Sequence, residues 1–141
     1  MSTTPSYAEL HCTSNFSFLK GASHPEEMIE RAKTLGYRAI AITDECSVAG
    51  IVRAHVAAQA AGIQLLIGSE FQLEEGTRFI LIAKNRSGYG YICNLISTAR
   101  RRAPKGDYYL SHKHFVETED NCIAIWLPSN ESLEEAHTCL L

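Results

Sequence analysis

Residues 39–71 read AIAITDECSVAGIVRAHVAAQAAGIQLLIGSEF, and this stretch decides the fold. It opens with a short apolar run at 39–43 that is rich in β-branched residues and predicts a strand. An alanine-rich segment at 51–61, closed by Gly62, predicts a helix, and the run at 64–71 predicts a second strand. Continuous apolar strands that alternate with helices are typical of a parallel sheet that is covered on its faces or closed into a barrel. The sequence therefore predicts an α/β fold.

The flanking segments extend this pattern in both directions. On the N-terminal side, a strand is expected at 7–13 and a helix at 25–35. On the C-terminal side, a turn at 74–76 leads into an apolar run at 79–83, which either pairs with the preceding run as a hairpin or lies as a separate strand. A helix at 88–102, a strand at 122–127 and a helix that starts at Ser132 complete the expected elements. We expect one domain over residues 1–141, because no linker, repeat or low-complexity segment divides the chain.

Composition excludes several classes of protein. The chain has 141 residues, 45% of them hydrophobic, and its formal charge of −3 gives no overall attraction to nucleic acid. No apolar run is long enough to span a membrane and no secretory signal is visible, so we expect a soluble, cytoplasmic protein without a membrane partner. Five cysteines without a C-x-x-C pair indicate reduced thiols, and they argue against a disulfide framework or a cysteine zinc site.

The predicted strands end in polar residues. The end of the first strand includes His11, that of the second Asp44 and Glu45, and that of the third Glu70. If these strands are parallel, the four side chains share one rim and offer imidazole and carboxylate ligands suited to zinc or manganese. The alternatives are a hydrogen-bonded structural histidine, helix capping or solvation for Asp44 and Glu45, and an ion pair of Glu70 with Arg78.

A basic run follows the helix expected at 88–102. Arg100, Arg101, Arg102 and Lys105 lie close to two tyrosines at 108–109. Clustered cations neutralise phosphates and aromatic rings stack on bases, so this run is a candidate DNA contact. The alternative is a solvated last turn that the helix dipole favours.

Several motifs occur in a fixed order along the chain: YAELH at 7–11, NFSFLKGASHPEE at 15–27, AITD at 41–44, GSE at 68–70 and LIAKNRSGY at 81–89. In this order they resemble the PHP (polymerase and histidinol phosphatase) domain at the start of bacterial polymerase α subunits, and most of all its error-prone, ImuC-type branch. The resemblance implies the N-terminal part of a distorted seven-stranded, TIM-like β/α barrel. In active members of the family this barrel holds a metal cluster that hydrolyses phosphoesters.

The chain departs from the family's ligand pattern at five positions. The resemblance implies a histidine where this chain has Thr13, and an aspartate where it has Lys20. It implies histidines at the positions of Glu45 and Arg78, and a cysteine or histidine at the position of Pro128. Threonine and proline are not good ligands, and the two cations repel a divalent ion. We therefore expect the metal cluster to bind poorly, which agrees with the error-prone branch.

These observations lead to three functional hypotheses. The first is a structural PHP module of an error-prone DNA polymerase, active in damage-induced mutagenesis and translesion synthesis, with no catalytic residue and no cofactor in this chain. The second keeps zinc or manganese on the four strand-end residues and gives a weak phosphoesterase or proofreading exonuclease. The third is a DNA-contacting module. Because no polymerase palm is present, we expect nucleotidyl transfer only of the parent protein, and the expected partners are the rest of the polymerase chain, DNA through that chain, and other mutagenesis proteins.

Overall fold

The computed structural model describes residues 6–115 and 120–128. The elements in these residues follow the predicted order, while the helix expected from Ser132 lies outside the described residues. They are β1 (Ala8–Glu9), α1 (Pro25–Thr34), β2 (Ala39–Ile42), α2 (Ile51–Ala61), β3 (Gln64–Gln72), β4 (Arg78–Ala83), α3 (Arg86–Arg101), the 3-10 turn η1 (His112–His114) and β5 (Cys122–Leu127). The chain is thus mixed α/β.

The described strands form one five-stranded sheet in the order β1-β2-β3-β4-β5. β1, β2 and β3 are parallel, but β4 is antiparallel to β3 and β5 is antiparallel to β4. The expectation of a parallel sheet is therefore wrong for β4 and β5. The cause is the short connection after β3, where Leu73 N donates to Thr77 O at 2.8 Å and Gly76 has a φ of 95°. So short a connection cannot cross over to a parallel neighbour, and it makes β3 and β4 the hairpin that was one of the two alternatives.

Local capping sets the ends of the helices. The backbone N–H of His24 donates to the Glu27 carboxylate at 2.7 Å just before α1. The Asn85 side chain accepts from Gly88 N at 2.9 Å, so α3 starts at Arg86, two residues before the predicted start. α2 ends as predicted at Gly62, whose φ of 66° is left-handed.

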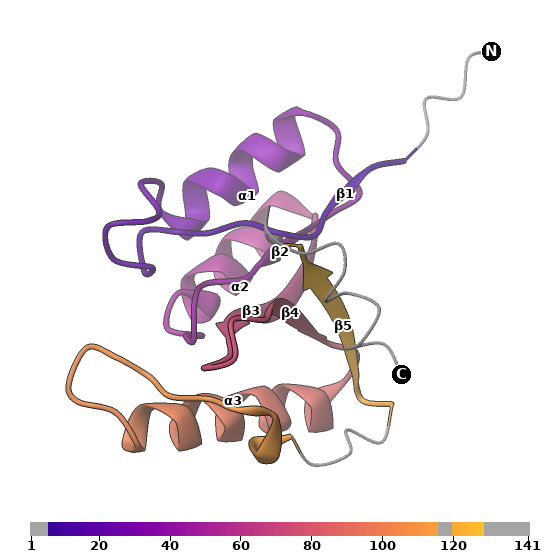
Figure 1. The fold of residues 1–141 in the computed structure, drawn as a ribbon. Helices are drawn as coiled ribbons and strands as arrows, with labels where there is room; N and C mark the ends of the chain where they lie inside the picture. Colours follow the sequence, from indigo (N-terminus) through magenta and orange to yellow (C-terminus); the bar gives the residue numbers. More distant parts are fainter. Residues whose placement is uncertain (1–5, 116–119, 129–141) are drawn as a thin grey trace.

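The helices and the sheet bury two main apolar clusters. Figure 1 shows α1 beside α2, with α3 lying apart from them at the other end of the sheet. The first cluster joins α1, α2 and β2, and the second joins α3 to β3 and β4. Ala41, Ile80 and Ile82 form a third cluster on the other face of the sheet. Glu70 lies directly opposite Ile80 in the β3–β4 register, so its side chain belongs to this other face.

The structure gives the state of four cysteines and the character of the helices. Cys12, Cys46, Cys93 and Cys122 are free thiols, and the fifth, Cys139, lies outside the described residues. Within residues 6–115 and 120–128, none of the helices has the length and apolar character needed to cross a membrane.

Candidate functional site

The parallel strands bring their polar ends to one rim of the sheet. His11 follows β1, Asp44 and Glu45 follow β2, and Glu70 lies inside β3, which continues to Gln72. The pairing of β2 with β3 extends past Ile42: Glu70 N donates to Asp44 O at 3.2 Å, and Cys46 N donates to Glu70 O at 2.8 Å. This backbone ladder fixes Asp44, Glu45 and Glu70 relative to one another.

Glu70 lies at the centre of an interaction with two basic side chains. His11 Nε2 is 2.8 Å from Glu70 Oε2, and Arg78 bonds the other oxygen through Nε at 3.2 Å and through Nη2. Burial by itself raises the pKa of the Glu70 carboxyl, but hydrogen bonds from Arg78 and His11 outweigh it and the pKa is lowered. The hydrogen bond to Glu70 in turn raises the pKa of Arg78. The ion pair with Arg78, one of the alternatives left open by the sequence, is confirmed.

Asp44 is buried and is held by the loop that follows β1. Its side chain accepts hydrogen bonds from Ser14 N at 2.8 Å, Ser14 Oγ at 2.7 Å and Ser17 Oγ at 2.8 Å. Neither helix capping nor solvation describes it, because Asp44 is only 1% exposed and α2 begins at Ile51 after Gly50. Its carboxylate oxygens thus anchor the loop of residues 14–21.

That loop is folded tightly. Lys20 N and Gly21 N both donate to Ser17 O at 3.0 Å. Gly21 runs so close to the backbone that a Cβ atom at this position would lie 2.0 Å from Ser14 O. A close backbone approach of this kind requires glycine. These contacts fold residues 14–21 into the tight loop from which Lys20 extends.

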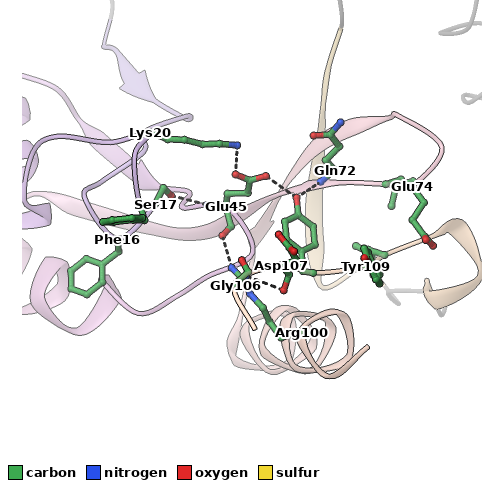
Figure 2. Close-up of a pocket in the computed structure, with 14 residues that line it drawn as sticks. Phe16, Ser17, Lys20, Glu45, Gln72, Glu74, Arg100, Gly106, Asp107 and Tyr109 are labelled. Atoms are coloured by element: carbon green, nitrogen blue, oxygen red, sulfur yellow. Dashed lines mark hydrogen bonds and ion pairs between the residues drawn. The ribbon is translucent and has the colours of Figure 1, made fainter. Parts of the chain in front are cut away.

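Glu45 pairs with the cation that the loop presents. Lys20 Nζ bonds Glu45 Oε2, as Figure 2 shows, and Tyr108 OH donates to Glu45 Oε1 at 3.0 Å. Tyr108 OH also accepts from Gln72 N at 2.9 Å, and burial followed by the nearby Glu45 charge raises the pKa of its phenol. The sequence does not predict this role of Tyr108, because it indicates only an aromatic ring for base stacking beside the basic run. Its position after the basic run was the only available signal.

Arg100 differs from the rest of the predicted basic run. Its guanidinium donates to the carbonyls of Cys46 at 3.2 Å, Gly106 at 3.1 Å and Asp107 at 3.2 Å, and it lies 5.4 Å from the centroid of the Tyr108 ring. It thereby fixes the loop after α3 against the strand-end rim. The remaining members of the run, Arg101, Arg102 and Lys105, are exposed, and Arg102 bonds His114.

The donor set does not fit a divalent metal ion. Lys20 bonds Glu45 and Arg78 bonds Glu70, so a cation of the chain already lies against each of these two carboxylates. The Asp44 oxygens accept from Ser14 and Ser17. Within residues 6–115 and 120–128, no three His, Cys, Asp or Glu side chains are grouped as a metal site. A metal ion would have to displace ammonium and guanidinium groups, which repel it at close range.

The chain is an α/β protein with polar strand ends at one rim of its sheet. Comparisons with known proteins show the family to which it belongs. The PHP domain family matches residues 9–136, and the chain belongs to this family. It is 53% identical over 131 residues to an error-prone DNA polymerase of Methylococcus capsulatus, covering 92% of this chain and 12% of that protein. It is 50% identical over 137 residues to an error-prone DNA polymerase of Xanthomonas campestris pv. campestris, covering 94% and 13%. The resemblance seen in the sequence is confirmed.

Solved structures agree with the family. One is a protein from Bifidobacterium adolescentis described as a metal-dependent phosphoesterase, which is 26% identical with a TM-score of 0.53. That match covers 70% of this chain and 36% of the other chain. The present chain thus spans about one eighth of the polymerases it resembles and about a third of this solved structure.

Proposed function

We propose that this chain is the front part of a PHP domain in an error-prone DNA polymerase, and that it serves there as a structural module and not as a hydrolase. One observation carries the proposal: two of the three carboxylates at the strand-end rim, Glu45 and Glu70, pair with cations of the same chain. Lys20 pairs with Glu45, and Arg78 pairs with Glu70 with His11 as a further partner.

The physical argument concerns charge and geometry. An active metal cluster needs carboxylate oxygens and imidazole nitrogens that are free to coordinate. In this chain one Glu70 oxygen contacts Arg78 and the other contacts His11, so both are occupied. The arrangement stabilises the folded domain by placing basic side chains against carboxylates that a metal would otherwise bind. We retain His11, Asp44, Glu45 and Glu70 as the remnant of the ligand set.

Further parts of the proposal concern the parent protein. The distorted seven-stranded barrel would be completed by strands outside this chain, and β1 and β5 are the sheet edges that such strands could pair with. The polymerase domains, DNA held by them, and other mutagenesis proteins would be the partners, in the cytoplasm. The length of the relatives supports this, because each is about eight times as long as the matched part.

Metal content and hydrolysis together test the proposal. The 141-residue chain is incubated with zinc or manganese, dialysed, and analysed by elemental mass spectrometry, and p-nitrophenyl phosphate hydrolysis is then measured. We expect substoichiometric metal and no hydrolysis above that of the His11→Ala variant. Stoichiometric metal and hydrolysis that are both lost in His11→Ala would establish the alternative, a metal-dependent phosphoesterase or proofreading exonuclease, which the Bifidobacterium similarity favours.

A DNA contact is the third candidate, favoured by the exposure of Arg101, Arg102 and Lys105. Phosphate contacts by these side chains predict binding of single-stranded DNA that weakens steeply with salt. The triple replacement by glutamine should abolish such binding. Arg100 is not included, because its replacement would also release the loop it holds.

A further inference from the structure

A cleft lies beside the strand-end rim and shares the Lys20–Glu45 pair with it, but its other lining residues have no part in the proposed structural role. Its volume is about 830 Å³, and its walls are the loop of residues 16–20 and the loop of residues 106–110 (Figure 2). Its floor includes Glu45, Gln72 and Leu73. The cleft is as large as the larger sites that bind small molecules, which measure roughly 300–1,000 Å³.

Aromatic side chains stand at the two sides of this cleft. Phe16 and Phe18 belong to one loop and Tyr109 to the other, and Phe18 is 84% exposed. Hydrogen bonds to Asp44 and to the Ser17 carbonyl hold the loop on both sides of Phe18. A preorganised loop loses little conformational entropy when a partner covers it.

The charges of the cleft favour a cationic ligand. The lining contains two cations, Lys20 and Arg100, and three carboxylates, Glu45, Glu74 and Asp107, for a net charge of −1. Both cations are already engaged, Lys20 by Glu45 and Arg100 by backbone carbonyls. Within the described part of the chain, the side chains of Glu74 and Asp107 make no hydrogen bond or ion pair. A DNA phosphate would meet these free carboxylates and be repelled.

We propose that this cleft docks a segment of another protein that carries an arginine or lysine between apolar side chains. The basic side chain would pair with Glu74 and Asp107, and the apolar neighbours would pack on Phe18 and Tyr109. A small cation inside the cleft would leave most of Phe18 uncovered, whereas a polypeptide covers the rim as well as the floor. This proposal goes beyond the structural role in the polymerase and does not depend on it.

Fluorescence anisotropy with the 141-residue chain tests the proposal. The probe is a fluorescein-labelled peptide of alternating leucine and arginine, compared with a leucine–glutamate peptide and with oligothymidylate. We expect the arginine peptide to bind and the other two not to bind. Phe18→Ser, and separately the double variant Glu74→Gln/Asp107→Asn, should each weaken binding about thirtyfold, the fold-change at the lower limit for hot-spot residues.

Matched controls come from the neighbouring residues. Leu19→Ser removes a side chain that is 91% exposed in the same loop but does not line the cleft, and Glu75→Gln removes a neighbouring exposed charge. Both should bind the arginine peptide as the wild type does, and all variants should unfold at the wild-type temperature. The proposal is overturned if the arginine peptide does not bind, if oligothymidylate competes with it, or if the controls lose as much affinity. It is also overturned if sedimentation shows a dimer that Phe18→Ser dissociates, because the occupant of the cleft would then be a second copy of the chain.

Discussion

Replacement of Asp44 by alanine gives the sharpest test of the loop that presents Lys20. Asp44 is 1% exposed, and its loss would leave Ser14 N, Ser14 Oγ and Ser17 Oγ without their acceptor. Hydrogen bonds to a charged group contribute about 1.5–3 kcal/mol each, and a buried donor left unpaired costs about 1–3 kcal/mol. The three are coupled and do not add fully, so we expect Asp44→Ala to lower the free energy of unfolding by about 3–5 kcal/mol.

Urea unfolding followed by circular dichroism measures this loss. Asp44→Asn should cost less, about 1–2 kcal/mol, because its amide oxygen still accepts from Ser14 N or Ser17 and its NH₂ group can donate to Ser14 Oγ. Asp107→Asn is the control: this exposed carboxylate has no bonded partner among the described residues, so its change should stay within about 0.5 kcal/mol. Trypsin should also cut after Lys20 faster in Asp44→Ala than in the wild type. A loss below about 1 kcal/mol with unchanged trypsin cleavage would refute the anchoring role.

Three other substitutions test the Arg78–Glu70 ion pair, the close backbone approach at Gly21 and the buried core around Ile29. Arg78→Met should destabilise the chain at pH 7 by about 1–3 kcal/mol, less than for a fully buried pair because Arg78 is partly exposed. Because folding lowers the pKa of Glu70, the ionised Glu70 stabilises the chain above its unfolded pKa of about 4.3, and this stabilisation is lost as the pH falls through the folded pKa. The urea midpoints of the wild type and Arg78→Met should therefore converge in acid. A difference between the two midpoints that stays constant with pH would contradict this. Gly21→Ala should prevent tight closure of the loop on Ser14 O and cost more than about 2 kcal/mol, checked by thermal unfolding; a wild-type midpoint would count against the close approach. Ile29→Ala, at a site with 0% exposure, should cost about 2–5 kcal/mol in the same assay, and a smaller loss would show that the helix layer repacks.

The elements of the fold could be predicted because their signals are local. Alanine-rich periodicity and Gly62 gave α2 its observed bounds, and the apolar run at 122–127 became β5 with the predicted bounds. Strand direction could not be predicted in the same way, because a buried antiparallel strand and a buried parallel strand both read as continuous apolar runs. The tight turn at Gly76 decided the direction of β4.

Part of the candidate site could be predicted from the order of the strands. Ends of parallel strands share a rim, and this rule placed His11 beside Glu70 from sequence alone. The hydrogen-bond donors to Asp44 come from the loop after β1, and a contact made by a loop leaves no hydrophobic periodicity from which it could be predicted. The bond of Tyr108 to Glu45 was missed because Tyr108 lies in the segment after α3 and not at the end of a strand. Whether the four strand-end residues ever bind metal stays a prediction.

The central claim is that cations of the chain itself have taken the place of a metal at the strand-end rim. A crystal structure of the chain grown in excess manganese, with anomalous diffraction data, tests it most directly. We predict that Lys20 and Arg78 keep their contacts with Glu45 and Glu70, and that no anomalous peak lies between these side chains. A strong peak coordinated by His11 and Glu70, with Arg78 turned away, would contradict the claim.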